Sequence, residues 1–169
     1  MCNKINIRSI ELRDLEFVKE VLNEVIANHD FYLSEYPKSD GDIRQWYDEH
    51  QNSDLYAIFI AEVDGTAAGW VSLSNFRSID GYDISVELSV YVSDCYYRMG
   101  VASAMMKYIE DFARSKNRLH KIVSVITATN FGSIALHEKQ GFETEGILKE
   151  VAKKNGKYQD VVLMSKVIN

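Results

Sequence analysis

VELSVYVSDCYYRMGVAS, residues 86–103, is the most informative part of the sequence. It begins inside a run, Ile84 to Val92, in which apolar and polar residues alternate, the pattern of a strand that buries one face. After the loop Ser93 to Met99, Gly100 opens a segment whose apolar residues recur at the spacing of an amphipathic helix. These positions are Val101, Met105, Tyr108, Ile109 and Phe112. The stretch therefore predicts a strand, a loop and a helix in succession.

The start of this predicted helix suits an anion. Gly100 and the small side chains of Ala102 and Ser103 let backbone N–H groups approach a ligand closely, and the helix dipole adds partial positive charge. A phosphate or pyrophosphate is the expected ligand, although glycine at this position is also an ordinary helix cap. The sequence contains neither G-x-G-x-x-G nor G-x-x-x-x-G-K-[ST], which argues against nicotinamide dinucleotides and nucleoside triphosphates.

Strands and helices alternate along the rest of the chain. Hairpins are predicted at Asp64-Gly65 and around Asn155-Gly156, because both dipeptides tolerate the positive φ of a type I′ turn. Ser39 and Asp42 have the spacing of a capping box. The predicted strands are 5–9, 56–63, 66–74, 84–92 and 121–127, and the predicted helices are 15–26, 43–50, 101–112 and 131–140, with an aromatic loop at 28–38. The expected fold class is α+β, with a central, mainly antiparallel mixed sheet and flanking helices.

Composition and charge limit the class of protein. A chain of 169 residues with 46% hydrophobic and 26% charged residues is expected to form one globular domain spanning residues 1–169. The net charge of −6 disfavours nucleic acid and anionic membranes as partners. Cys2 and Cys95 are too few for a disulfide framework, and the longest apolar run, Leu55 to Ala61, is too short to span a bilayer. A cytoplasmic location is expected. Three histidines are too scattered for a metal site: His29, His50 and His120.

A second informative stretch is NFGSIALHEKQGF, residues 130–142. Asn130 stands where a helix N-cap is expected, and His137 lies two turns later on nearly the same face. Glu87 lies in mid-strand, where a carboxylate is most often a solvated residue on an open sheet face. Taken singly, Asn130 as a plain cap and His137 as an exposed helical residue are the ordinary interpretations. Their joint spacing predicts that both line one groove.

Together, RMGVAS (98–103), VELSVYV (86–92) and NFGSIALHEKQGF (130–142) resemble the GNAT superfamily of acetyl-CoA-dependent N-acetyltransferases. Within that superfamily the chain is similar to the phosphinothricin and methionine-sulfone acetyltransferase group, over essentially its whole length. The resemblance implies a GNAT-type sheet and acetyl-CoA as co-substrate without a metal. It implies as acceptor the primary amine of a small molecule, an amino acid or an amino-acid-like antibiotic such as phosphinothricin. It also implies a homodimer, because relatives can meet a second subunit at the end of the sheet near Asn155-Gly156.

The resemblance assigns roles to individual residues. It implies that the pyrophosphate of coenzyme A lies on backbone N–H groups of the turn 98–103 and that the pantetheine arm pairs with the strand 90–92. The cofactor-binding residues it implies are Leu88, Val90, Tyr91, Val92, Arg98, Met99, Gly100, Val101, Ala102, Ser103 and Asn130. The acid/base residues it implies are Glu87 and His137, and the acceptor pocket is implied at Phe76, Arg77, Tyr82 and Glu87.

These roles are chemically reasonable. Acyl transfer to an amine requires a neutral nitrogen, a site for the developing oxyanion and a proton for the departing thiolate. Glu87 can take the ammonium proton, directly or through water, if burial raises its pKa. His137 can donate to the sulfur or share the base role. A backbone N–H near Leu88 would polarise the thioester carbonyl if the strand bulges there. Direct transfer in a ternary complex is the expected mechanism.

Two departures from the group's usual pattern bear on function. Tyr97 occupies a position where the family usually has Gln or Arg, but backbone donors need no particular side chain, so coenzyme A binding is expected to survive. Ile79 and Asp83 stand where the group tends to have basic residues. An acidic amino-acid analogue clamped by Arg77 and a more cationic amine therefore both remain open as acceptors. The alternative functions are acetylation of a protein N-terminus or lysine, and a non-catalytic acyl-CoA sensor.

Overall fold

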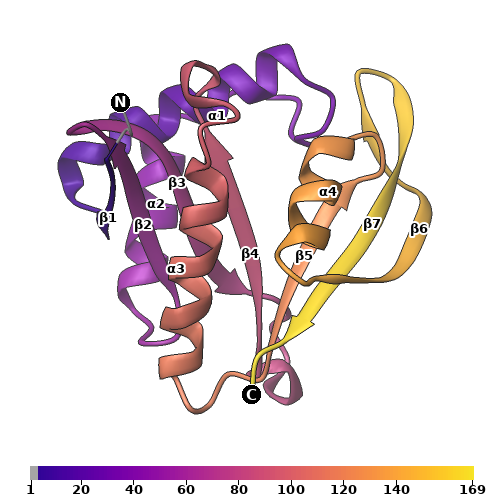
Figure 1. Cartoon of the computed structure of the whole chain (residues 1–169). Coiled ribbons are helices and arrows are strands. Elements are labelled where there is room, and N and C mark those ends of the chain that lie inside the picture. The colour runs from indigo at the N-terminus through magenta and orange to yellow at the C-terminus, as the bar shows by residue number, and fades with distance from the viewer. Residues whose placement is uncertain (1–3) are drawn as a thin grey trace.

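The chain forms one mixed sheet flanked by helices (Figure 1). The computed structural model describes residues 4–169. The seven strands lie in the order β1-β2-β3-β4-β5-β7-β6, and the β4–β5 pair is parallel while the others are antiparallel. The strands are β1 Ile5–Ser9, β2 Ala57–Val63, β3 Thr66–Asn75, β4 Ser85–Val92, β5 Lys121–Thr127, β6 Glu143–Lys154 and β7 Lys157–Val167. The helices are α1 Leu15–Asn28, α2 Asp40–Gln51, α3 Val101–Ser115 and α4 Phe131–Lys139. The predicted α+β fold class is confirmed.

Local sequence signals account for most element boundaries. The capping box before α2 is confirmed, since Ser39 Oγ accepts from Asp42 N at 3.2 Å and Ser39 N donates to the Asp42 carboxylate at 2.8 Å. This cap starts α2 earlier than the predicted residue 43. Both predicted hairpin turns are confirmed, with positive φ at Asp64-Gly65 and at Asn155-Gly156.

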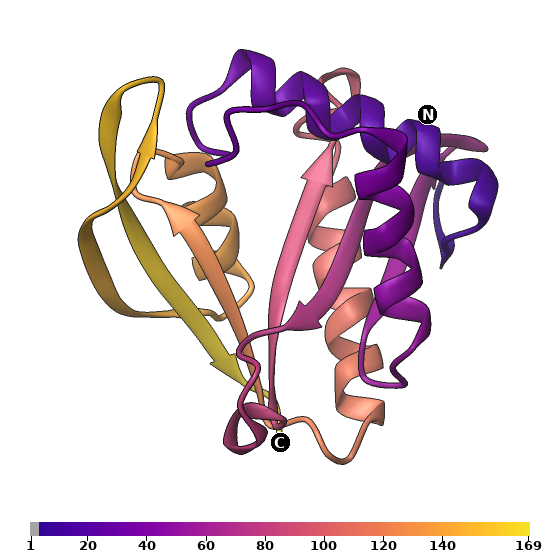
Figure 2. The ribbon, with the colours of Figure 1, turned by 180° about the vertical axis from the view of Figure 1, so that it is seen from behind.

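The two faces of the sheet carry different helices (Figures 1 and 2). Helices α1 and α2 cover one face of β1 to β4, where Val18, Ile43 and Trp70 belong to one buried cluster. Helices α3 and α4 lie on the opposite face, where Met105 and Leu88 belong to a second cluster. Successive β4 residues therefore alternate between the two helix layers.

Strands β4 and β5 are paired only at one end. Their partners are Ser85↔Lys121, Val86↔Ile122 and Glu87↔Val123, and beyond these residues the strands diverge, as Figure 1 shows. On its other edge β4 stays paired with β3 as far as Gly69↔Val92, without a shift of register. The bulge that sequence reasoning allowed near Leu88 is therefore absent. The backbone of β4 departs from β5 because the two strands splay.

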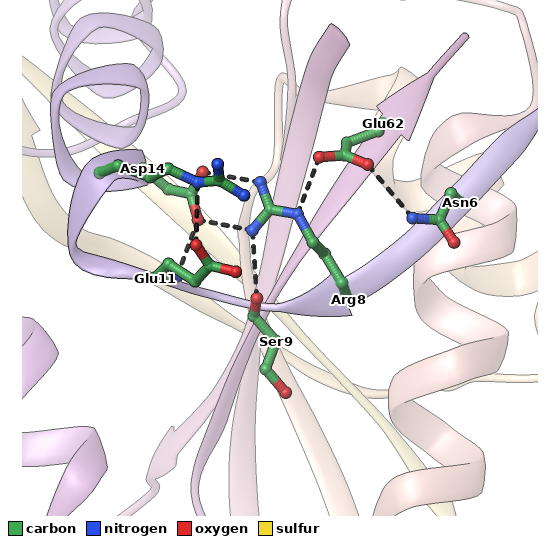
Figure 3. Close-up of polar contacts among 7 residues, drawn as sticks. Asn6, Arg8, Ser9, Glu11, Asp14 and Glu62 are labelled. Carbon is green, nitrogen blue, oxygen red and sulfur yellow. Dashed lines mark hydrogen bonds and ion pairs between the residues drawn. The ribbon is translucent and has the colours of Figure 1, made fainter. Parts of the chain in front are cut away.

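An ion-pair network anchors β1 to the start of α1 (Figure 3). Arg8 donates to both oxygens of the Asp14 carboxylate at 2.7 and 2.8 Å and to Glu62 Oε1 at 2.7 Å. Glu11 N also donates to Asp14, at 2.7 Å. Burial alone would raise the pKa of Asp14, but the hydrogen bonds from Arg8 and Glu11 outweigh burial and hold it below its usual value. Asp14 is thus ionised and paired in a nearly buried position.

No helix within residues 4–169 has both the length and the apolar character needed to cross a bilayer.

Replacing Asp14 with asparagine should destabilise the protein by about 2–4 kcal/mol, because the half-buried Arg8 guanidinium would lose one of its two carboxylate partners and keep only Glu62. Urea unfolding at neutral pH measures the change. The matched control is Asp48→Asn, since Asp48 pairs with Arg44 on the surface of α2, and its effect should stay below about 0.5 kcal/mol. Equal losses in the two variants would contradict the assignment.

The depressed pKa of Asp14 also sets a pH dependence. A carboxyl with a lowered folded-state pKa contributes stability that is present above its usual pKa of about 4 and is lost as the pH falls through the folded-state value. The wild type should therefore lose more unfolding free energy than Asp14→Asn between pH 5 and pH 3, two values chosen to be about one unit on either side of 4. Equal losses of unfolding free energy in the two proteins would show that Asp14 does not cause this pH dependence.

Candidate active site

A large cavity occupies the gap between the diverging strands β4 and β5. Its volume is about 870 Å³, within the range of pockets that hold small molecules and cofactors. Its walls come from β4, β5, the turn before α3, the first turns of α3 and α4, and the segment that follows α1. The site is therefore built from elements far apart in the sequence.

The turn into α3 presents backbone donors to this cavity. Arg98 and Gly100 have φ values of +63° and +83°, and Gly100 precedes the first helical residue, Val101. The first N–H groups of a helix have no acceptor within the helix, so those of Val101 to Ser103 are free for a ligand. These residues line the cavity with Arg98 and Gly100. The turn is suited to an anionic group such as a pyrophosphate.

Two other residues of this turn, Met99 and Tyr97, differ in whether they line the cavity. Met99, one of the expected cofactor-binding residues, is exposed and does not line the cavity. Tyr97 does line it, and burial together with a hydrogen bond involving Asp94 raises its pKa to about 12. Tyr97 is therefore neutral at physiological pH, and Arg98 is the one arginine or lysine among the cavity-lining residues of the described chain.

The free edge of β4 supplies further backbone groups. His120 N and Lys121 N donate to Ile84 O at 2.8 and 3.1 Å, so the backbone of Ile84 faces β5. Because strand geometry repeats every two residues, the N–H and C=O groups of Val90 and Val92 face the same side. The β5 pairing has already ended at Glu87, so this edge is open to an extended ligand. The cavity is lined by Leu88, Val90, Tyr91 and Val92 along this edge.

Helix α4 places Asn130 and His137 at the cavity. Asn130 Oδ1 accepts from Ser133 N at 3.1 Å, so the side chain caps the helix and its NH₂ group remains a donor. His137 is 2% exposed, which rules out the interpretation of an exposed helical residue. Both residues line the cavity. Their predicted common placement is confirmed.

The hydrogen bonding of His137 fixes its tautomer. Nδ1 lies 2.8 Å from Ser133 O, and because a carbonyl oxygen can only accept, Nδ1 carries the hydrogen. Burial lowers the pKa of His137, although the Ser133 carbonyl partly opposes this, so the neutral ring is favoured. Nε2 is then an unprotonated acceptor, and it is buried without a partner within the described structure. The ring is suited to accept a proton or hydrogen bond and, in this state, cannot donate from Nε2.

Glu87 lies at the point where β4 and β5 separate. Its side chain is partly buried, and burial raises its pKa, while the positive charge of Arg77 partly lowers it again. Glu87 lines the cavity. A carboxylate with a raised pKa is suited to general base catalysis near neutral pH.

Glu87 and His137 reach the cavity from opposite faces of the sheet. The alternation along β4 places Glu87 on the side of Tyr91, which packs with Tyr32 and Trp70 beneath α1 and α2. His137 belongs to α4, whose Leu136 packs on the α3 side. Both can line one space because the sheet is open between β4 and β5. Glu87 and His137 therefore line one cavity from different helix layers.

Three of the expected acceptor residues lie close to one another. Phe76 and Tyr82 have ring centroids 5.7 Å apart, and the Arg77 guanidinium lies over the Phe76 ring at 5.3 Å. Of the four expected acceptor residues, only Glu87 lines the cavity. The positive charge of Arg77 nevertheless affects the cavity, because it lowers the pKa of Glu87.

The sequence analysis did not identify all of the residues that form the cavity wall. Residues of the aromatic loop after α1 line the cavity, among them Phe31, Tyr32 and Ser34. Ser124 of β5 also lines it, with its hydroxyl buried and without a partner within residues 4–169. A serine inside the apolar run IVSVI was the available signal for this position.

Comparisons with known proteins agree with this geometry. A family description, the acetyltransferase (GNAT) domain, matches residues 7–163. The chain belongs to the GNAT acetyltransferase family. This GNAT acetyltransferase is 27% identical over 159 residues to the L-methionine sulfoximine/L-methionine sulfone acetyltransferase of Pseudomonas aeruginosa, covering 94% of this chain and 92% of that protein. It is also 27% identical to the phosphinothricin N-acetyltransferase of Streptomyces viridochromogenes, covering 93% of this chain and 84% of that protein.

Solved structures give the same family. The ribosomal-protein-alanine N-acetyltransferase of Brucella melitensis is 31% identical, with a TM-score of 0.91 and coverage of 96% of this chain and 99% of that one. The yncA protein of Salmonella typhimurium, solved with its cofactor acetyl-CoA, is 25% identical, with a TM-score of 0.92 and coverage of 98% and 95%. The predicted resemblance to GNAT acetyltransferases is confirmed.

Replacing Gly100 with alanine should weaken acetyl-CoA binding about tenfold, because a Cβ at φ +83° is strained by roughly 1–2 kcal/mol and the turn must move to relieve it. Isothermal titration calorimetry with acetyl-CoA measures the change. Gly146→Ala is the control, since Gly146 lies in β6 with open space around its Cβ position. A Gly100→Ala affinity within twofold of wild type would contradict the role of this turn.

Replacing Arg77 with methionine should raise the pKa of Glu87 further, because it removes the positive charge that opposes the effect of burial. The acidic limb of kcat/KM against pH should then move to higher pH, since Glu87 must be ionised to act as a base. Arg44→Met, on the far surface of α2, should leave the limb in place. A shift to lower pH in Arg77→Met would contradict the assignment.

Proposed function

We propose that this GNAT acetyltransferase transfers the acetyl group of acetyl-CoA to the primary amine of a small molecule, an amino acid or amino-acid-like compound, by direct transfer in a ternary complex. The observation that carries the proposal is one cavity lined by the α3 turn, the free edge of β4, Glu87 and His137. The names of the methionine sulfone and phosphinothricin relatives support the acceptor class.

Acetyl-CoA would supply the activated acetyl group when bound, and the residues present fit it. Backbone N–H groups of Arg98 and Gly100 to Ser103 would hold the pyrophosphate, and the edge of β4 at Val90 and Val92 would pair with the pantetheine amides. The Asn130 NH₂ group would donate to the same arm. The fit is supported by donors and acceptors that already face the cavity.

Glu87 is proposed as the general base. Its carboxylate would take a proton from the incoming ammonium, directly or through a water, and leave a neutral amine that can attack. His137 Nε2, unprotonated at the start because Nδ1 carries the ring hydrogen, would accept the second proton from the nitrogen once it has attacked the thioester. The protonated ring would then give that proton to the departing thiolate, so that coenzyme A leaves as the free thiol.

Charged side chains near Glu87 bear on which acceptor the site would take. Arg77 lies beside the site and could clamp a carboxylate bidentately. Ile79 and Asp83 supply no further positive charge, and Asp83 is itself paired with Arg118 at 2.7 Å. We therefore infer that Arg77 would hold one carboxylate of the acceptor, such as the α-carboxylate of an amino acid.

Acetylation of a protein N-terminus is the second candidate, favoured by the likeness to the Brucella enzyme. The loop after α1 lies along the cavity and contributes Phe31, Tyr32 and Ser34 to its wall. A wall at this position favours a compact acceptor over a long peptide. A non-catalytic acyl-CoA sensor would need neither Glu87 nor His137.

We also propose a homodimer. Helices α1 and α2 cover β1 to β4, and the same face of β5, β7 and β6 carries exposed apolar side chains. They include Val125, Leu148 and Val167. A second copy of the chain on this face would remove them from water. Light scattering on a size-exclusion column, at a concentration range spanning the micromolar, tests this against a monomer.

Release of free coenzyme A, followed with a thiol reagent, should be detected with one or more members of a panel of amino acids and their sulfone and phosphinate analogues. Polyamines and peptides complete the panel. Turnover with peptides alone would favour the protein acetyltransferase. Tight acetyl-CoA binding without thiol release from any amine would favour the sensor and overturn the proposal.

Replacing Glu87 with glutamine should lower kcat/KM by about 10²–10⁴-fold, because the base is lost while the shape of the site is kept. The measurement is the same thiol assay with the best amine, across pH. Glu20→Gln, an exposed change on α1, is the matched control. Unchanged kcat/KM across pH in Glu87→Gln would remove this residue from the base role.

A further inference from the structure

Lys154, at the end of β6, is a fully buried cation. Its relative exposure is 1%. Nζ donates to Ile26 O at 3.1 Å and to Ser34 O. Both acceptors are backbone carbonyl oxygens. Burying an ammonium group is costly unless strong acceptors surround it, so this placement requires an energetic reason.

The position of the two carbonyls supplies that reason. Ile26 lies in the last turn of α1, where backbone carbonyls have no partner within the helix and carry the negative end of the helix dipole. Ser34 lies in the irregular segment between α1 and α2, which has no strand or helix to satisfy its backbone. The Lys154 ammonium thus satisfies two carbonyls that would otherwise lack partners, and they stabilise its charge.

Neighbouring contacts tie the same segment to the C-terminal half of the chain. Asn155 N donates to Glu35 Oε1 at 2.9 Å, and Asn155 Nδ2 donates to Asp30 Oδ1 at 2.8 Å. Thr127 Oγ1 of β5 donates to Phe31 O at 2.9 Å. Figures 1 and 2 both show the segment after α1 reaching toward the β6–β7 turn and α4 across the open end of the sheet. We call residues 29–38 the acceptor loop.

The acceptor loop is part of the cavity wall. His29, Phe31, Tyr32, Leu33 and Ser34 all line the cavity that contains Glu87. The β4–β5 pairing ends at Glu87, so strand pairing cannot hold the two halves together farther along the gap. The shape of this wall therefore depends on the contacts that Lys154 and Asn155 make with the loop.

We propose that Lys154 is a positioning residue for acetyl transfer: its buried ammonium fixes the acceptor loop against the β6–β7 hairpin and so sets the wall against which the amine binds. The proposal rests on the proposed function. Lys154 does not line the cavity and acts through the loop. Its loss should weaken amine binding and leave the α3 turn, which binds the nucleotide end, unchanged.

The test is Lys154→Met, which keeps the length of the side chain and removes its charge and donors. The KM for the amine should rise at least tenfold, kcat should change less, and the acetyl-CoA Kd should stay within twofold of wild type. Amide hydrogen exchange in the acceptor loop should be at least tenfold faster than in the wild type. Lys157→Met, an exposed change in the same hairpin, should match wild type in all four readouts.

Asn155→Gly gives a second, milder variant in case Lys154→Met does not fold. Glycine keeps the positive φ of 50° at this turn position and removes the contact with Asp30. Amide hydrogen exchange in the acceptor loop should be at least threefold faster than in the wild type, and the KM for the amine should rise. Exchange and amine KM both within twofold of wild type in the folded variants would overturn the proposal.

Different results would overturn the proposed function and the positioning role of Lys154. Absence of thiol release by the wild type with every amine would overturn the proposed function, and the positioning role with it. In that case hydrogen exchange would still decide whether Lys154 holds the loop. Faster exchange together with an unchanged amine KM in an active enzyme would overturn the positioning role alone.

Discussion

Two parallel strands normally exchange evenly spaced hydrogen bonds along their length, but β4 and β5 do so only from Ser85 to Glu87. Everything distinctive about the site follows from this short pairing. It leaves one edge of β4 without a strand, opens a cavity through the sheet, and places Glu87 where the gap begins. An edge left unpaired in this way is suited to a ligand with amide groups, which can take the place of a missing strand.

The gap also explains how two ionisable groups on opposite faces can line one cavity. Glu87 is on the side of α1 and α2, and His137 is on the side of α3 and α4. Burial acts on them in opposite directions, raising the pKa of Glu87 and lowering that of His137. Both shifts favour the uncharged form, which is what partial removal from water does to an acid and to a base alike. The Ser133 carbonyl then decides which nitrogen of His137 is free.

Individual residues show which features of the fold and the site could be predicted from the sequence. Period-two alternation and the turn dipeptides predicted the strands and hairpins, and the capping residues Ser39 and Asn130 were recognised from their local spacing. The sequence indicated the acceptor loop only as an aromatic stretch. It also placed Met99 in the cofactor turn, although Met99 is exposed and does not line the cavity. Lys154 and Ser124 were not identified, because nothing near them in the sequence reports what surrounds them in space.

The sequence by itself determined the elements, their order, the class of fold and the family, since each depends on residues close together along the chain. Tertiary structure alone decided that Glu87 and His137 face one space from opposite layers, that His137 is buried with Nε2 free, and that Lys154 reaches the end of α1. The burial of Lys154, for example, depends on a contact with Ile26, more than a hundred residues away in the sequence. Such contacts are fixed only when the sheet and its two helix layers come together.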